Sequence, residues 1–158
     1  MLHANADQRV LGYLGRALSL EFTAVQQYST QARLVATWGL TEEANRLRNE
    51  AGEEMGHVDR IIGRMLALGV APNASQLRPA RLGSSLYKLL QQNQAFELEL
   101  VRLYEEATRY CAKQGDHDNR LFFETLLEEE RAHGHEMTRW LEKLEQPAAA
   151  VSRQRATF

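Results

Sequence analysis

Four glutamates and two histidines have the types and the spacing of a set of metal ligands. They are Glu21, Glu54, His57, Glu97, Glu130 and His133. The set contains two Glu-x-x-His pairs, at 54–57 and 130–133. On a helix, residues three apart lie about 60° apart around the axis, so both side chains of a pair can reach one point. Carboxylate oxygens with imidazole nitrogens suit a pair of iron or manganese ions.

The ligands recur with a fixed spacing along the chain. Glu21 precedes Glu54 by 33 residues, and Glu97 precedes Glu130 by the same number. An offset of 76 residues maps the first three ligands onto the second three, which indicates two pseudo-repeats. The same offset pairs several neighbours: Leu14 with Leu90, Val25 with Val101, Tyr28 with Tyr104, Arg33 with Arg109 and Glu53 with Glu129.

The glutamates stand where a solvated surface is not expected. Glu21 lies between Leu18 and Val25 on an apolar stripe, and Glu97 interrupts a similar stripe. Four carboxylates in one interior would cost several kcal/mol each unless they were paired or bound to metal. In the dinuclear sites of ferritin-like bundles, Glu54 and Glu130 would bridge the metals, Glu21 and Glu97 would be terminal ligands, and His57 and His133 would each supply one nitrogen.

Four helices are expected to position these ligands. Of the 158 residues only 3 are proline and 10 are glycine, and 17 of the 21 acidic residues are glutamate, which favours helix over aspartate. Apolar residues recur at helical spacing, and Thr41 is expected to cap the second helix. The helices are expected at about 7–37, at 41–68, from a cap at Ser84 or Ser85 to about Lys113, and from a cap at Asp116 or Asp118 to about Glu145.

The connection at 70–83 is expected to be long and irregular. Its fourteen residues reach roughly 46 Å when extended. A helix of ~27 residues is about 40 Å long, so the connection can run the length of a bundle. The third helix would then lie parallel to the second. The predicted fold class is all-α, a ferritin-like four-helix bundle with a long crossover between helices two and three.

Composition excludes several other classes of protein. The net charge is −2, without the basic footprint of nucleic-acid binding, and a single cysteine, Cys111, excludes an internal disulfide or a cysteine-rich cluster. No secretory signal and no run of ~20 apolar residues is present, so we expect a cytoplasmic protein without membrane segments. We expect one domain over 1–158, with the bundle at 7–145 and a basic tail at 146–158, where a short fifth helix is an open alternative.

Some neighbours of the ligands allow two interpretations. Glu53 and Glu129 are expected to be solvated, with support of the ligands or metal access as the alternative. Tyr28 and Tyr104 are either hydrogen-bond partners of ligands, with electron donation as a further role, or ordinary buried tyrosines. His135, two residues from a ligand, must point away and is expected on the surface.

A second stripe is predicted on the outward side of the second helix. Met55 lies about 160° from His57 around the helix axis and therefore faces away from the bundle interior. An exposed apolar stripe usually marks an interface, so we expect a homodimer. The stripe comprises Met55, Val58, Asp59, Ile62 and Leu66.

Several runs resemble the bacterioferritin family. They are Leu20-Glu21-Phe22-Thr23-Ala24-Val25-Gln26-Gln27-Tyr28, the Trp38-Gly39-Leu40 turn, Glu54-Met55-Gly56-His57-Val58-Asp59-Arg60, Ala95-Phe96-Glu97-Leu98-Glu99-Leu100 and Glu129-Glu130-Arg131-Ala132-His133. The resemblance covers roughly residues 8–145 and all six ligand positions. It implies a ferroxidase, in which a di-iron centre of two iron ions oxidises Fe(II) to Fe(III) with dioxygen or hydrogen peroxide.

The resemblance also implies cofactors and partners. Met55 falls at the family's haem ligand, so two subunits would share one b-type haem. Homodimers would assemble into a closed shell of about 24 subunits that stores iron, with an external ferredoxin-type reductant. The chain departs from the family in its basic tail, which lacks an apolar stripe, and at Asn49, where the family often has an iron-binding histidine.

Two alternative functions remain open from the sequence. One is a rubrerythrin-like di-iron oxidase or peroxidase without a storage shell, which would need a separate electron donor because this chain has one cysteine. The other is a haem-binding shell subunit whose bundle is inert.

Overall fold

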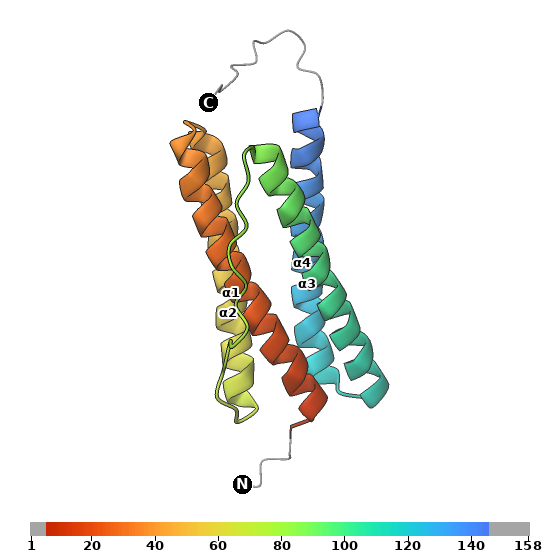
Figure 1. The fold of residues 1–158 in the computed structure, drawn as a ribbon. Coiled ribbons are helices and arrows are strands. Elements are labelled where there is room, and N and C mark those ends of the chain that lie inside the picture. Colours follow the sequence, from red (N-terminus) through yellow and green to blue (C-terminus); the bar gives the residue numbers. More distant parts are fainter. Residues whose placement is uncertain (1–5, 146–158) are drawn as a thin grey trace.

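Four long helices form a bundle (Figure 1). The computed structural model describes residues 6–145, so the predicted tail at 146–158, with its open fifth helix, lies outside the described residues. No strand occurs within 6–145, and the predicted all-α class is confirmed. The helices are α1 (Gln8–Thr37), α2 (Thr41–Ala67), α3 (Leu86–Gln114) and α4 (His117–Glu145).

Short local signals fix where the helices begin and end. Gly39 (φ 78°) and Gly115 (φ 68°) adopt left-handed backbone after α1 and α3, where a side chain would be strained. Ser85 caps α3 by accepting a hydrogen bond from the backbone N–H of Lys88. The prediction that Thr41 caps α2 is wrong, because Leu40 occupies the cap and provides no side-chain hydrogen bond.

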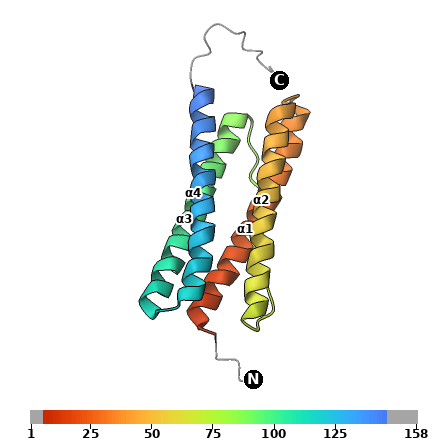
Figure 2. The ribbon, with the colours of Figure 1, turned by 180° about the vertical axis from the view of Figure 1, so that it is seen from behind.

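The connection between α2 and α3 crosses the full length of the bundle. In Figure 1 it climbs beside α1 from the lower end of α2 to the upper end of α3. The rear view in Figure 2 shows α2 and α4 on the opposite face, away from this connection. α3 therefore runs parallel to α2 and antiparallel to α1, as the reach of the segment predicted.

A closed ring of hydrogen bonds attaches the crossover to the bundle. Gln27 Nε2 donates to Asn93 Oδ1 (2.8 Å), and Asn93 Nδ2 donates to Gln31 Oε1 (2.7 Å). Gln31 Nε2 then donates to the carbonyl of Arg81 (3.2 Å), whose own N–H donates to Gln27 Oε1 (3.4 Å). The three side chains are buried, so each bond satisfies a group that would otherwise be costly in the interior.

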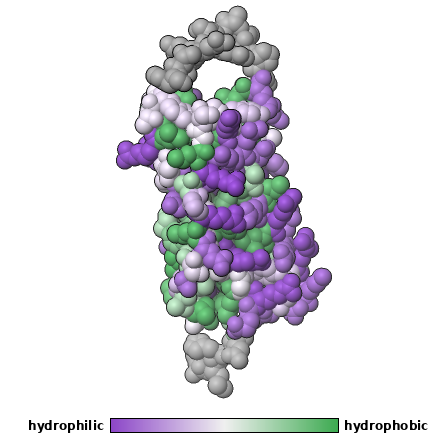
Figure 3. Space-filling model, in the orientation of Figure 1, coloured by the Kyte–Doolittle hydropathy of each residue, from purple (hydrophilic) through white to green (hydrophobic). Residues whose placement is uncertain are grey.

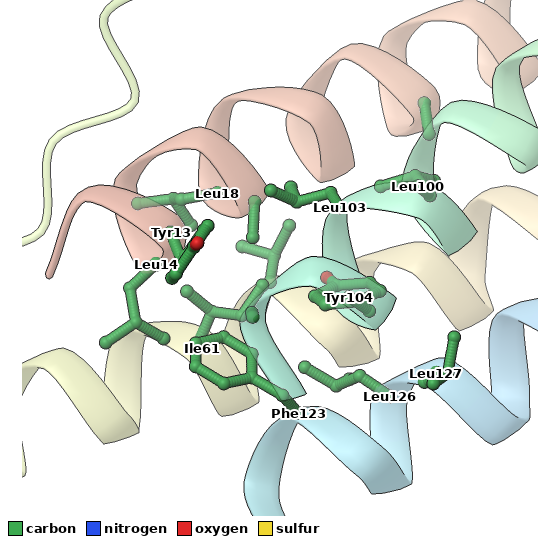
Figure 4. Packing of buried hydrophobic residues seen from close by; sticks show 14 of the residues in the cluster. Tyr13, Leu14, Leu18, Ile61, Leu100, Leu103, Tyr104, Phe123, Leu126 and Leu127 are labelled. Atoms are coloured by element: carbon green, nitrogen blue, oxygen red, sulfur yellow. The ribbon is translucent and has the colours of Figure 1, made fainter. Parts of the chain in front are cut away.

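Two apolar clusters lie towards opposite ends of the bundle, on either side of the predicted ligands. The larger one contains Tyr13, Leu14, Ile61 and Phe123, and part of it is shown in Figure 4. The smaller one is built around Leu47, Leu89 and Trp140. This packing on both sides encloses the middle of the bundle, where charged side chains are not expected without partners.

The face of the molecule that carries α1, the crossover and α3 is mixed in polarity. Figure 3 shows hydrophilic side chains interspersed with apolar ones over the face that carries α1, the crossover and α3. None of the helices in 6–145 has an apolar stretch long enough to cross a membrane. Cys111 is buried as a free thiol, and burial raises its pKa to about 11.

The outward face of α2 agrees only in part with the predicted stripe. Met55 is 45% exposed and Leu66 is 60% exposed, so both face away from the bundle as expected. Val58 was predicted on the same stripe, but its side chain is fully buried in the larger apolar cluster. Val58 lies four residues after the buried ligand Glu54, about 40° from it around the helix axis, so it belongs to the inward side of α2.

Candidate metal centre

The six predicted ligands converge at the centre of the bundle. All four glutamates are at most 1% exposed, and His57 is 3% exposed. His133 lies at the edge of the cluster, with 11% of its side chain exposed. α1 and α3 each contribute one glutamate, whereas α2 and α4 each contribute a Glu-x-x-His pair, which follows from the predicted pseudo-repeats.

The ligand atoms form two overlapping groups, each compact enough to hold one metal ion. Within each group the atoms lie within 4.8 Å of one another. Glu54 and Glu130 belong to both groups, which is the property required of bridging ligands. The first group is Glu21, Glu54, His57 and Glu130, and the second is Glu54, Glu97, Glu130 and His133.

Both histidines direct the same nitrogen inward. Nδ1 of His57 lies 2.7 Å from Glu130 Oε1 and 3.0 Å from Glu54 Oε2. Nδ1 of His133 lies 3.0 Å from Glu54 Oε1 and 3.4 Å from Glu130 Oε2. The imidazole rings are stacked, with centroids 5.6 Å apart. Each Nδ1 is therefore placed to bind a metal beside both bridging carboxylates.

The outer nitrogens of the histidines meet carboxylates from the opposite hairpin. Nε2 of His57 lies 2.8 Å from Glu129, and Nε2 of His133 lies 2.8 Å from Glu53. A carboxylate at this position holds the proton on Nε2 and leaves Nδ1 free for a metal. Glu53 and Glu129 are exposed to solvent as expected, at 58% and 43%, and they also contact the ligands, which was the alternative interpretation.

The two outer carboxylates differ in the charge of the side chains around them. Arg60 donates two hydrogen bonds to Glu129 and balances its charge. The residue 76 positions later is Glu136, which lines the same groove as Glu53 and brings a further negative charge. The two imidazoles therefore differ in surroundings. His133 is more exposed than His57, and more negative charge surrounds it.

Two buried tyrosines hold the terminal glutamates. The hydroxyl of Tyr28 donates to Glu97 Oε1, and the hydroxyl of Tyr104 donates to Glu21 Oε1. Each bond joins α1 to α3, so the tyrosine of each pseudo-repeat binds the terminal glutamate of the other. Burial, followed by the nearby glutamates, raises the pKa of both hydroxyls well above the ordinary value, and they remain donors at neutral pH. Of the two interpretations, hydrogen bonding to the ligands is confirmed, and electron donation stays a prediction.

Protons compensate part of the negative charge of the clustered carboxylates. Burial and then the other carboxylates raise the pKa of Glu21 and Glu97 well above the ordinary value. Burial opposes the charge on His133, but the bonds to Glu130 and Glu54 outweigh it and raise its pKa to about 12. A metal that binds Nδ1 must displace such protons, so metal affinity falls as the pH falls.

A buried carboxyl that the sequence reasoning missed lies next to the centre. Glu50 is 8% exposed, and burial raises its pKa to about 7. One oxygen of Glu50 lies within 4.8 Å of ligand atoms of Glu53 and His133. Its position four residues before Glu54, on the same side of α2, was the signal available in the sequence.

An open groove between α2 and α4 leads to the histidines. It encloses about 470 Å³, and both His57 and His133 form part of its wall. The acidic side chains Glu53, Glu129 and Glu136 line the same groove. Negative charge around an opening attracts cations, so a divalent metal is favoured on this face.

The outer carboxylates allow a matched test of their role. Replacing Glu129 by alanine is expected to lower Co(II) affinity about 10–100-fold, because His57 loses the group that holds its Nε2 proton. Cobalt absorption during titration of the metal-free protein measures this affinity. Glu53→Ala is the matched variant, and in it we expect weaker Co(II) binding at the ion beside His133 instead. Unchanged affinity in both variants would contradict this role.

Comparison with known proteins places this geometry among related chains. A family model for the ferritin-like domain matches residues 11–146. The bacterioferritin of Rhodobacter capsulatus is 41% identical over 127 residues, which cover 80% of this chain and 79% of that protein. The bacterioferritin of Brucella melitensis is 34% identical over the same shares of chain.

A solved structure of R. capsulatus bacterioferritin is also similar to this chain. It superposes with a TM-score of 0.84 at 37% sequence identity, covering 88% of this chain and 87% of that one. That protein was described with a metal-free dinuclear site and a haem iron. The similarity extends over the bundle that carries the six candidate ligands.

Proposed function

This chain belongs to the ferritin-like family and, within it, to the bacterioferritins, and on that premise we propose that it is an iron-storage subunit with a ferroxidase centre. One observation carries the proposal: two four-residue ligand groups share Glu54 and Glu130. The ligand set fits two iron ions, because Oε2 of Glu21 and Oε2 of Glu97 are buried without a hydrogen-bond partner within 6–145 and both ligand groups offer carboxylate oxygens and an imidazole nitrogen to one point.

The proposed roles of the ligands follow from their positions. Glu54 and Glu130 would bridge the two ions, and Glu21 and Glu97 would each bind one ion as terminal ligands. His57 and His133 would complete the two sites through Nδ1. When bound, the two ions supply one electron each to dioxygen or hydrogen peroxide, which converts Fe(II) to Fe(III).

The surrounding residues prepare the site for its substrate. Glu129 and Glu53 hold a proton on each outer nitrogen, which keeps the imidazoles oriented with Nδ1 inward. Tyr28 and Tyr104 fix the carboxylates of the terminal ligands. Fe(II) would approach through the acidic groove between α2 and α4, and the apolar clusters at both ends exclude water from the centre.

The outward face of α2 supports a proposed haem site. A ligand shared by two subunits must project from the surface, and the thioether of Met55 is 45% exposed. Gly52, one turn earlier, has no side chain, and a Cβ there would meet no atom within 4 Å. This open space beside an exposed sulfur fits a flat b-type haem between two copies of α2. Bound haem would supply an electron-transfer centre.

The assembly completes the proposal. We infer a homodimer through the outward face of α2, and from it a closed shell of about 24 subunits that holds the Fe(III) product. An external ferredoxin-type protein would supply electrons for iron release. The acidic groove would face the stored iron, because cations collect where negative charge is concentrated.

Mass and metal content measured on one sample test the proposed function. A purified sample that elutes as a large shell, contains haem and takes up iron far beyond two ions per chain is the expected result. A small dimer that holds only two iron ions per chain would instead identify an oxidase without storage. A shell that contains haem but takes up no iron would show that the bundle is inert.

A further inference from the structure

A second groove reaches the metal centre from the side, between α3 and α4. It encloses about 470 Å³, and its wall includes the terminal ligand Glu97. Glu97 is 1% exposed, and its Oε2 has no hydrogen-bond partner among the described residues. The groove therefore ends against the segment of α3 that carries this enclosed ligand. Its wall combines the apolar residues Ala95, Leu98, Val101 and Gly134 with polar ones, among them Gln94, Arg131, His135 and Thr138.

The corresponding side of the other hairpin is filled. The residue 76 positions before Gly134, and therefore equivalent to it in the other pseudo-repeat, is Val58, whose side chain is fully buried. Gly134 has no side chain, and a Cβ built there would meet no atom within 4 Å. In the same way, the groove residue Leu98 corresponds to the larger Phe22, which packs against the core. The pseudo-repeats therefore differ at this point: apolar side chains fill the α1/α2 side, and a glycine leaves the α3/α4 side open.

Hydrogen bonds keep the groove in shape. Gln94 Nε2 on α3 donates to Thr138 Oγ1 on α4 (2.9 Å). Thr138 Oγ1 donates in turn to the carbonyl of Gly134 (2.9 Å). Arg131 on α4 also binds Glu105 on α3 (2.9 Å). The bonds of Gln94 and Arg131 join α3 to α4 on either side of the glycine and fix the spacing of the two walls, and the bond of Thr138 to Gly134 lies within α4.

Resting on the proposed ferroxidase function, we propose that the α3/α4 groove is the path by which dioxygen reaches the di-iron site, with Gly134 keeping it open. Dioxygen is small and uncharged, so an apolar wall suits it and the acidic α2/α4 groove offers it no attraction. Fe(II) is drawn to that acidic groove instead. Separate paths allow the iron to remain bound at the histidines while the oxidant arrives beside Glu97.

Closing the groove by substitution tests the path. Gly134→Val copies the residue of the other pseudo-repeat, and a Cβ at this position meets no atom within 4 Å. Anaerobic protein preloaded with two Fe(II) ions per chain is mixed with dioxygen in a stopped-flow instrument. We expect the second-order rate constant for oxidation to fall about tenfold, which corresponds to about 1.4 kcal/mol. Co(II) affinity of the metal-free protein should be unchanged.

A control and a second measurement isolate the groove. Gly12→Val introduces the same side chain at an exposed position on α1 and should oxidise iron at the wild-type rate. Metal-free crystals pressurised with xenon should show xenon in the groove of the wild type and of Gly12→Val, and none in Gly134→Val. If Gly134→Val disturbs Co(II) binding, Leu98→Trp, which fills the groove from α3, decides the question.

The outcomes separate the path from the function. Wild-type oxidation rates in the variant that closes the groove, or no xenon in the wild-type groove, would overturn the proposed path. A wild-type protein that fails to oxidise bound Fe(II) would instead overturn the ferroxidase function itself.

Discussion

Replacing Glu54 by alanine is expected to abolish rapid Fe(II) oxidation. Glu54 belongs to both ligand groups, so its loss removes an oxygen ligand from each ion at once. It also leaves Nδ1 of both histidines without one of their carboxylate neighbours. We expect the initial rate of oxidation to fall by at least about 100-fold, more than the loss of a supporting group outside the ligand set would cause. Absorbance of the Fe(III) product after mixing Fe(II) with aerated protein measures the rate.

Three further variants test whether this loss is specific to the shared ligands. Glu130→Ala removes the other shared ligand and should match Glu54→Ala, whereas Glu21→Ala removes a ligand of one ion and should retain partial Co(II) binding. Glu42→Ala changes an exposed glutamate at the start of the same helix and should oxidise iron normally. If Glu54→Ala retained the wild-type rate, the assignment of the centre as a ferroxidase would fail.

The fold followed closely from local patterns in the sequence. Apolar spacing and the breaks at Gly39 and Gly115 placed all four helices to within about two residues, the usual uncertainty of helix ends. The direction of α3 followed from the length of the crossover alone. The error at Thr41 arose because a hydroxyl before an acidic turn is only a statistical signal of a cap. In the structure Leu40 occupies the cap position and Thr41 is the first residue of the helix.

The convergence of the six ligands was also predictable, because each stripe position can be assigned from a single helix. Contacts between helices were harder to assign. The pairing of His57 with Glu129, and of Tyr28 with Glu97, depends on the relative height of two helices, which one-dimensional spacing does not contain. The 76-residue offset relates the members of these pairs, so knowledge of one contact between the hairpins would have predicted the equivalent contact in the other direction.

The difference between the pseudo-repeats carries much of the functional information. Positions that obey the offset build the dinuclear site, and positions that break it distinguish its surroundings. Arg60 against Glu136 sets unequal charge around the two histidines. Val58 against Gly134 sets unequal access from the two sides. A symmetric pair of hairpins thus gives two metal sites with similar ligands and different approaches.

Met55 is the third such difference, because the offset maps it onto Arg131, which pairs with Glu105 on its own hairpin. Only the α2 side therefore presents a thioether to a second copy. Replacing Met55 by leucine preserves the size of the side chain and removes the sulfur. We expect haem content to fall from about half a haem per chain, the value for one group on a twofold axis, to nearly none. The absorbance ratio of haem to protein after purification measures this loss.

The interpretation requires that the dimer survive the substitution. Leu66→Ala reduces apolar area on the same outward face without touching the sulfur, so it should weaken association and keep the haem in the dimer that remains. Met55→Leu should show the reverse pattern, with an intact dimer and no haem, since leucine packs as well but cannot bind iron. Wild-type haem content in Met55→Leu would show that another residue holds the group. Because Met55 lies on the opposite side of α2 from His57, we expect Fe(II) oxidation to continue in the haem-free protein.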